Sequence, residues 1–498
     1  MATDSNEKEN NKKETEEKKV PPKDNIVVSK HTATIGGKKI KYTVTTGTMV
    51  LKEEIQKKGE KEGESEGEKP KASVFFIAYA RDDVSDKRKR PISFSFNGGP
   101  GSASVWLHLG VLGPKRVLLD KDGNAPPPPY QLVNNDYSLL DQTDLVFIDP
   151  VSTGYSRVLP GEKAKEFHGY KKDIESVGDF IRLYATRYKR WTSPKFIIGE
   201  SYGTTRASGL AGYLQERHGM YLNGLILVSS ILNFQTARFF IGNDLPYVLF
   251  LPTYTATAWY HKKIKGDLKK LLAEVEHFAA NDYTLALMKG SGLAAADRAT
   301  VIKKLAAYSG LSEDYIDRTD LRIQIHRFCK ELLRDQRRTV GRLDSRFTGI
   351  DRDSAGEVSE FDPASANLSG AYTSMFNNYV RDDLKFESDL PYEVSAGLWQ
   401  SWSYAEYQNQ YVNVGETLRK AISMNPNLKV HVTNGYYDLA TPYFATQYTF
   451  DHLQLDPSLQ KNISMSYYEA GHMMYIHLPS LRKMKEELSA FIKNSVPR

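Results

Sequence analysis

A serine in a setting typical of a nucleophile stands at residue 201, within Lys195–Arg206, which reads KFIIGESYGTTR. A short apolar run leads into Gly199–Gly203, and a segment with a helical pattern follows from about residue 204 to 216. A strand, a G-x-S-x-G turn and a helix in this order indicate a nucleophile elbow. Such a turn places the hydroxyl at the N-terminus of a helix, where developing negative charge is stabilised. We therefore predict that Ser201 is a nucleophile.

The same pattern occurs a second time, at Gly63–Gly67, inside the run KKGEKEGESEGEKP. No apolar segment flanks this copy, so we predict that it lies in a solvated loop. The comparison shows that the flanking structure, and not the five letters alone, decides what the pattern means.

A serine hydroxyl needs a nearby base, and that base needs an acid to orient it. In proteins built on this elbow, the acid and then the histidine follow the serine along the chain, in loops after later strands. Asp438 follows the expected strand 429–434, and His472 follows the expected strand 463–468. Both positions fall at the carboxyl ends of strands, the edge at which Ser201 also lies. We predict a triad of Ser201, Asp438 and His472.

Other candidates fit this chemistry less well. Asp451 and Asp456 fall in or after an expected helix. His477 lies five residues after His472, a pair that suggests a metal site, but no third ligand is evident nearby. We predict that the chain holds no metal.

The oxyanion of a tetrahedral intermediate needs two backbone N–H donors. In proteins with this elbow, one donor is the residue after the nucleophile, here Tyr202, and the other comes from a loop after an earlier strand. The glycine-rich loop Asn97–Gly101 follows the expected strand 92–96 and occupies that place.

The remaining elements must position these groups. Residues 26–51 alternate like a hairpin turned at Gly36-Gly37, a charged loop is expected over 52–69, and a strand resumes at 72–80, which together predict an antiparallel leader. From residue 91, strands and helices alternate, which predicts a parallel sheet covered on both faces. The expected strands are 92–96, 144–149, 195–198 and 224–229, and the expected helices are 170–188 and 204–216.

This alternation stops at residue 233, and residues 233–395 have a mostly helical pattern rich in Tyr and Arg. We interpret them as an inserted cap, whose aromatic residues either shape a substrate pocket or serve only for packing. The sheet pattern then returns, and a final helix is expected over about 479–493.

Composition narrows the classes of protein. The 498 residues include 67 basic and 61 acidic side chains, a balance that argues against a nucleic-acid partner. No window is apolar enough to span a membrane. The single cysteine, Cys329, excludes an intrachain disulfide and is expected to pack inside a helix. Residues 1–25 are too polar to order themselves and contain no signal peptide, so the chain is either cytoplasmic or an exported form, periplasmic or secreted, whose signal has been removed.

Five segments, taken in order, resemble the serine carboxypeptidase family, and the branch looks bacterial. They read FNGGPGSAS, DPVSTGYS, GESYGTTR, GYYDLATP and AGHMMY, and the resemblance extends from about residue 26 to the C-terminus. It implies an α/β-hydrolase fold, with a mostly parallel central sheet and an inserted helical cap. The implied division is a disordered segment 1–25, core parts 26–232 and 396–498, and the cap 233–395.

The resemblance also implies a function. Members of the family remove residues from the free C-terminus of peptides through an acyl-enzyme, without a cofactor, and we expect a monomer or a homodimer. By matching positions, Gly99 and Tyr202 are the oxyanion donors, and Asn97, Gly98 and Glu200 bind the terminal carboxylate of the substrate. A carboxyl such as Glu200 facing a substrate carboxylate must share a proton with it, so we expect peptidase activity to favour acidic pH.

The chain departs from better-known members at Ser95, where a tryptophan is usual, and at Ser102, which replaces a disulfide-forming cysteine. Val111 stands where a second glutamate of the carboxylate-binding network is expected. Without that glutamate, the specificity for a free C-terminus is either strict or relaxed, and the sequence leaves both alternatives open. An esterase or acyltransferase using the same triad, and a non-catalytic binding protein on this fold, are the alternatives.

Overall fold

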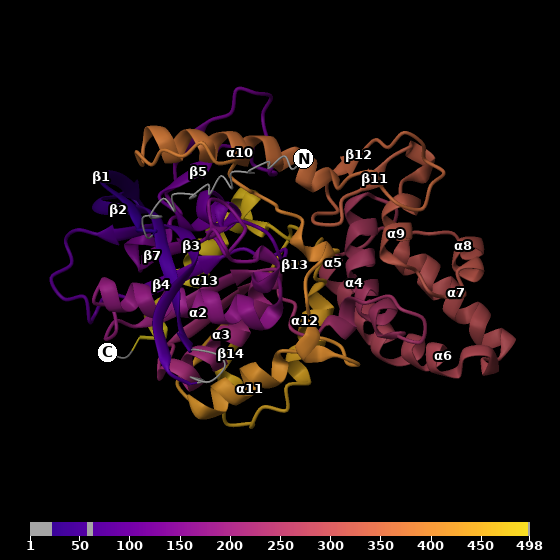
Figure 1. The fold of residues 1–498 in the computed structure, drawn as a ribbon. Coiled ribbons are helices and arrows are strands. Elements are labelled where there is room, and N and C mark those ends of the chain that lie inside the picture. The colour runs from indigo at the N-terminus through magenta and orange to yellow at the C-terminus, as the bar shows by residue number, and fades with distance from the viewer. Residues whose placement is uncertain (1–21, 57–62, 497–498) are drawn as a thin grey trace, which may run out of the picture.

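A computed structural model describes residues 22–56 and 63–496 of the chain (Figure 1). The predicted disordered segment 1–25 therefore lies mostly outside the described residues, and the first strand begins at Asn25. The strands are β1 (Asn25–Ile35), β2 (Lys38–Gln56), β3 (Ser65–Arg81), β4 (Ile92–Phe96), β5 (Lys115–Val117), β6 (Leu132–Asn134), β7 (Asp144–Ile148), β8 (Arg157–Val158), β9 (Lys195–Glu200), β10 (Gly224–Val228), β11 (Thr339–Val340), β12 (Thr348–Gly349), β13 (Lys429–Gly435) and β14 (Ile463–Tyr468).

The helices alternate with the later strands. They are α1 (Val105–Leu107), α2 (Tyr170–Arg187), α3 (Tyr202–His218), α4 (Leu245–Tyr260), α5 (Leu268–Phe278), α6 (Thr284–Lys289), α7 (Ala295–Ser309), α8 (Glu313–Arg318), α9 (Ile325–Glu331), α10 (Pro363–Asp382), α11 (Gly415–Met424), α12 (Tyr443–Asp451) and α13 (Leu478–Asn494).

One large sheet forms the centre of the molecule, with strands in the order β1-β2-β3-β7-β4-β9-β10-β13-β14 and β8 paired beside β3. From β7 to β14 neighbouring strands run parallel. Such strands read as continuous apolar runs because both faces of a parallel sheet are covered. The predicted fold class, a mostly parallel sheet of the α/β-hydrolase type, is confirmed.

Strand β9 shows how the sheet is covered. Phe196 and Ile198 join the core beneath α10 and α13, whereas Ile197 between them joins the core beneath α2, α3 and α11. This alternation follows from the two-residue period of a strand. The strand that precedes Ser201 is therefore packed on both faces.

The leader is antiparallel, as predicted. β1 pairs with β2 around Gly36 and Gly37, whose φ angles of +54° and +76° suit a two-residue hairpin turn. The expected charged loop 52–69 is wrong in part, because β2 continues to Gln56 and β3 begins at Ser65. Opposite charges pair across the two strands, as in Lys52 with Glu68 at 3.3 Å, so a strongly charged ribbon still forms a ladder.

This ribbon also contains the second G-x-S-x-G pattern. Residues 63–67 are all exposed, so the predicted solvation is confirmed, but Ser65 and its following neighbours belong to β3 and not to a loop.

Helices dominate between β10 and β13. Helices α4 to α9 share a hydrophobic core of their own and lie to one side of the sheet, whereas α10 packs on the core over the sheet itself (Figure 1). The turn between β11 and β12 contacts both loops that carry the predicted acid and base. The cap boundaries at 233 and 395 stay a prediction.

Cys329 is buried in α9, and burial raises the pKa of its thiol to about 12. The expected packing role is confirmed, because an un-ionised thiol is inert. Within the described residues, no helix combines the length and apolarity that a membrane crossing requires.

Candidate active site

Ser201 occupies a sharp turn between β9 and α3. Its φ of +60° and ψ of −130° lie outside the regions that a residue with a side chain normally adopts. A Cβ added at Gly199 would come within 2.2 Å of the carbonyl oxygen of Gly203, so the two glycines let strand and helix approach this closely. The amide of Ser201 donates to Val228 O at 2.9 Å. The structure has the strand-to-helix elbow that the sequence predicts.

Asp438 and His472 lie side by side after β13 and β14. The Nδ1 of His472 is 2.7 Å from Oδ2 of Asp438, and both side chains are buried. The two loops are also joined through the backbone, because the Tyr437 amide donates to Ala470 O at 3.0 Å. The parallel pairing of β13 with β14 therefore brings together two residues that are far apart in sequence.

The carboxylate of Asp438 is held in place by its own loop. Its Oδ1 accepts from the amides of Ala440 and Thr441 at 2.8 and 3.0 Å, and the Thr441 hydroxyl donates to Oδ2 at 2.7 Å. Thr441 was not predicted from the sequence. Its signal is local, since an aspartate often accepts from residues two and three positions later in a turn.

The charge state of His472 depends on Asp438. Burial alone lowers the pKa of this imidazole, but the charge and hydrogen bond of Asp438 outweigh burial and leave the pKa above its ordinary value. The charge of Glu200 adds to this rise, whereas that of Arg342 opposes it. A donor bond from Nδ1–H to the carboxylate leaves Nε2 free to accept a proton.

Ser201 and His472 lie at the same edge of the sheet. The hydroxyl of Ser229, next to the Val228 carbonyl that holds Ser201, donates to His472 O at 2.6 Å. Over residues 22–56 and 63–496, Ser201 Oγ makes no hydrogen bond to His472. In unliganded enzymes such bonds are often long and tighten only when substrate is bound.

The glycine-rich loop packs directly on the elbow. A Cβ at Gly98 would lie 2.5 Å from the Tyr202 amide nitrogen, which leaves no room for any other residue there. Gly99 has a φ of +105°, a conformation that favours glycine. Gly98, the residue before the predicted oxyanion donor Gly99, is therefore in close contact with the other predicted donor, Tyr202.

A buried ion pair contacts both the elbow helix and the glycine-rich loop. Arg206 on α3 contacts Asp173 on α2 at 2.8 Å, with side chains that are 1% and 2% exposed. The same guanidinium donates to Asn97 O at 2.7 Å, and the Tyr202 hydroxyl donates to Asp173 at 3.1 Å. The elbow helix and the glycine loop are therefore fixed to each other.

Glu200 is buried beside the nucleophile and accepts two hydrogen bonds. Asn97 Nδ2 donates to Oε1 at 2.9 Å, and the Tyr475 hydroxyl donates to Oε2 at 2.7 Å. Burial raises the pKa of Glu200 to about 7, against the opposing charge of His472 and these two bonds. Near neutral pH this carboxyl can therefore carry or lose a proton.

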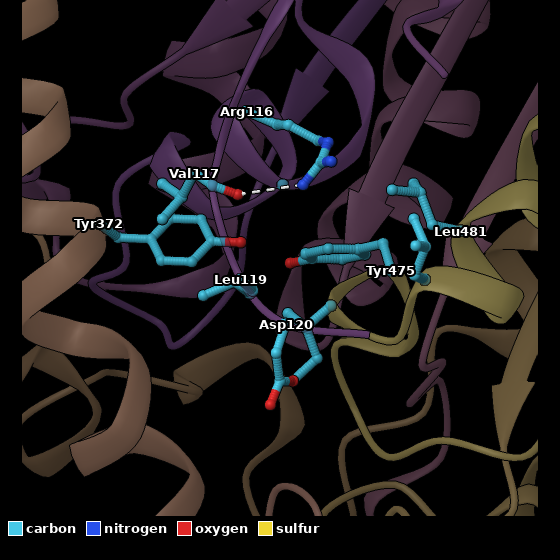
Figure 2. A pocket seen from close by; sticks show the side chains of 10 residues that line it. Arg116, Val117, Leu119, Asp120, Tyr372, Tyr475 and Leu481 are labelled. Carbon is cyan, nitrogen blue, oxygen red and sulfur yellow. Dashed lines mark hydrogen bonds between the residues drawn. The ribbon is translucent and has the colours of Figure 1, made fainter. Parts of the chain in front are cut away.

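Tyr475 is the residue of this network that the sequence did not reveal. Val111 is buried in the hydrophobic core and offers no polar group, and Tyr475 is what contacts the second oxygen of Glu200. Figure 2 shows the hydroxyl groups of Tyr475 and Tyr372 pointing toward each other in a small cavity that Arg116 also lines. The available signal was position, because Tyr475 comes three residues after His472 in the motif AGHMMY.

In the described part of the chain, no cluster of three or more His, Cys, Asp or Glu side chains is arranged to hold a metal ion. His477, considered above as a partner of His472, instead contacts Ser480 Oγ at 2.8 Å. That the protein uses neither a metal nor a cofactor stays a prediction.

Comparison with known proteins shows the family. Residues 64–485 match the family model described as serine carboxypeptidase. The chain belongs to the serine carboxypeptidase family. The pheromone-processing carboxypeptidase KEX1 of Saccharomyces cerevisiae is 32% identical over 135 residues, which are 26% of this chain and 17% of that protein. Serine carboxypeptidase-like 36 of Arabidopsis thaliana is 27% identical over 167 residues, which are 32% of this chain and 33% of that protein.

These matches cover less than half of either curated relative. A solved structure covers more of the family fold. The crystal structure of KEX1(delta)p, a prohormone-processing carboxypeptidase from Saccharomyces cerevisiae, aligns with a TM-score of 0.56 at 16% identity, over 90% of this chain and 91% of that one. At this identity the likeness shows the shared α/β-hydrolase fold.

Proposed function

We propose that this member of the serine carboxypeptidase family hydrolyses the last peptide bond of peptides that have a free C-terminus. The observation that carries the proposal is the pairing of two sites. A buried Asp438–His472 pair lies at the sheet edge that presents Ser201, and a carboxyl with a pKa of about 7, Glu200, directly precedes that serine.

The proposed chemistry is acyl transfer in two steps. The Oγ of Ser201 attacks the scissile carbonyl while Nε2 of His472 takes its proton, and the Gly99 and Tyr202 amides stabilise the oxyanion. The C–N bond breaks and the departing amino acid receives that proton. Water then attacks the acyl-enzyme with His472 as base, which releases the shortened peptide and restores Ser201. Asp438 holds the imidazole in the required tautomer.

Recognition of the terminal carboxylate is assigned to Glu200, Asn97 and Gly98. A protonated Glu200 donates a hydrogen bond to the substrate carboxylate, whereas an ionised Glu200 repels it. Tyr475 supplies the second hydrogen-bond partner of Glu200, so this carboxyl is held in place without a polar contribution from Val111. We expect the specificity for a free C-terminus to be retained.

Several properties stay predictions of this proposal. The substrates are peptides, no cofactor or metal takes part, and the protein acts as a monomer or a homodimer. The bacterial branch and the cap at 233–395 also remain predictions.

The test is a comparison of three substrates that differ only at the C-terminus. A blocked dipeptide with a free carboxylate, its C-terminal amide and its methyl ester are assayed with wild-type protein and S201A. We expect a kcat/KM for the free peptide at least about tenfold above that of the amide, equivalent to 1.4 kcal/mol of recognition. Equal rates for peptide and amide would contradict recognition of a free C-terminus, and ester cleavage alone would support the esterase or acyltransferase alternative. Failure of a fluorophosphonate probe to label Ser201 would indicate a non-catalytic protein.

A further inference from the structure

A short turn from the helical region reaches both loops that carry the predicted acid and base. The turn comprises Arg342–Ser345 and connects β11 to β12. It is distant in sequence from both loops, and none of its residues belongs to the proposed triad or oxyanion hole. Its contacts are nevertheless made with residues next to Asp438 and with His472 itself.

The turn contacts the Asp438 loop on both sides of the aspartate. The carbonyl oxygen of Arg342 accepts from the Leu439 amide at 3.0 Å. The amide and hydroxyl of Ser345 donate to Tyr437 O at 3.0 and 3.1 Å. The residues before and after Asp438 are therefore fixed by one neighbouring segment.

The same turn holds the His472 loop. The carbonyl oxygen of Leu343 accepts from the His472 amide at 2.7 Å, and Oδ2 of Asp344 accepts from the Gly471 amide at 3.1 Å. A Cβ on Gly471 would come within 2.4 Å of the Asp344 side chain, so the turn and the histidine loop are in close contact. Two successive amides of the histidine loop therefore donate hydrogen bonds to this turn.

Asp344 is itself rigidly held. Its carboxylate forms a two-oxygen ion pair with Arg346, at 2.9 Å from Nε to Oδ1 and 2.6 Å from Nη2 to Oδ2, and both side chains are buried. Asp362, which caps the N-terminus of α10, accepts from the amides of Arg342 and Leu343. The turn is therefore anchored independently of the loops that it holds.

We propose that the turn Arg342–Ser345 fixes the distance between the catalytic acid and base, and that Asp344 is the positioning residue for His472. This inference rests on the proposed function. Asp344 touches neither substrate nor the reacting atoms, so its loss displaces the imidazole without removing a binding contact. A displacement of about 1 Å can cost about a hundredfold in rate.

The experiment compares D344A and D344N with D351N. Asp351 forms a second buried ion pair in the same region, with Lys330 at 2.5 Å, and does not contact either triad loop, so D351N controls for lost stability. For each variant, kcat and KM are measured from pH 5 to 9, the folded state is checked by thermal unfolding, and the low-field proton signal of His472 Nδ1–H is recorded by NMR.

We expect D344A to lower kcat about tenfold or more while KM stays within about twofold, because only the transition state depends on the imidazole position. The acid limb of kcat should move to lower pH, since a looser bond to Asp438 leaves burial and Arg342 to lower the pKa of His472. The NMR signal should weaken or move upfield. D351N should change only the unfolding temperature.

A folded D344A with the kcat, acid limb and NMR signal of wild type would overturn the inference. If D344A does not fold, D344N decides, because its amide preserves the shape of the side chain and should shift kcat and the acid limb in the same direction to a smaller extent. Failure of the proposed function would be distinguished by full activity in S201A. The NMR comparison reports the position of His472 whether or not the protein has peptidase activity.

Discussion

The Tyr475 hydroxyl donates a 2.7 Å hydrogen bond to Glu200 Oε2, so a residue of the histidine loop holds the carboxyl beside the nucleophile. The proposed base, His472, and the proposed carboxylate-recognition group, Glu200, are therefore connected through Tyr475, which comes three positions after His472. The protonation state of Glu200 becomes part of the proposed reaction, because its pKa of about 7 lies within the pH range in which enzymes commonly work.

The first prediction concerns pH. As the pH rises through about 7, Glu200 ionises and repels the substrate carboxylate, so kcat/KM for a free-carboxylate peptide should fall about tenfold for each further pH unit. The acid limb, which reflects protonation of His472, should be common to peptide and ester substrates. In E200Q the alkaline limb should disappear for the peptide. A peptide profile that keeps rising to pH 9 in wild type would contradict this assignment.

The second prediction tests the partner of Glu200. The bond from Tyr475 favours the ionised carboxyl, so Y475F should raise the pKa of Glu200 and move the alkaline limb upward by about one pH unit, the worth of one such bond. The control is Y372F, since Tyr372 lines the same cavity but, in the described residues, makes no hydrogen bond to Glu200. Equal shifts in the two variants would assign the effect to the cavity rather than to the bond.

The third prediction concerns the acid of the triad. D438N preserves the shape of the side chain but turns an acceptor of Nδ1–H into a group that also donates, which favours the wrong tautomer of His472. We expect kcat to fall about 10³- to 10⁴-fold, as in other serine hydrolases with this change. D451N alters an exposed aspartate at the end of α12 and should keep wild-type kcat. Comparable losses in both variants would remove Asp438 from the triad.

The fourth prediction concerns the nucleophile. S201A should lower kcat by at least about 10³-fold and abolish labelling by a fluorophosphonate, leaving the residual catalysis of binding and the oxyanion hole. S65A changes the serine of the other G-x-S-x-G pattern, which is exposed on β3, and should behave as wild type. Active-site titration with the probe measures both variants directly.

The fifth prediction concerns stability beneath the elbow. D173A leaves the guanidinium of Arg206 buried without its ion partner, so the free energy of unfolding should fall by about 3–5 kcal/mol. D314A removes a partner of Arg318 in a pair whose side chains are 71% and 73% exposed, and should cost less than about 1 kcal/mol. Urea titration of both variants checks the contrast, and a loss below 1 kcal/mol in D173A would contradict the assigned role.

The parallel part of the fold could be predicted because its strands are buried on both faces. Strand β9 reads as an apolar run up to Glu200, and the change of period from strand to helix marks the elbow directly. The charged ends of β2 and β3, within the expected loop 52–69, were missed because their charges resemble those of a loop, and only their pairing across strands shows otherwise.

Part of the candidate site could be predicted from the order of its residues along the chain. Ser201, Asp438 and His472 each follow a recognisable strand, so their order along the chain indicates a common edge. The position of Tyr475 after His472 does not distinguish a functional phenol from one that only packs, and the turn at Asp344 acts largely through backbone groups, which follow no side-chain pattern. Their contribution depends on tertiary contacts that no local pattern records.

The placement of the acid and base on β13 and β14 has a consequence for the time at which activity arises. These two strands are synthesised last among the strands of the central sheet, in which β13 pairs with β10 and β14 pairs with β13. During synthesis on the ribosome, Ser201 is therefore present in the chain before His472, the proposed proton acceptor, has been added. Under the proposed mechanism, the chain therefore becomes able to cleave peptides only after its last two strands have joined the sheet.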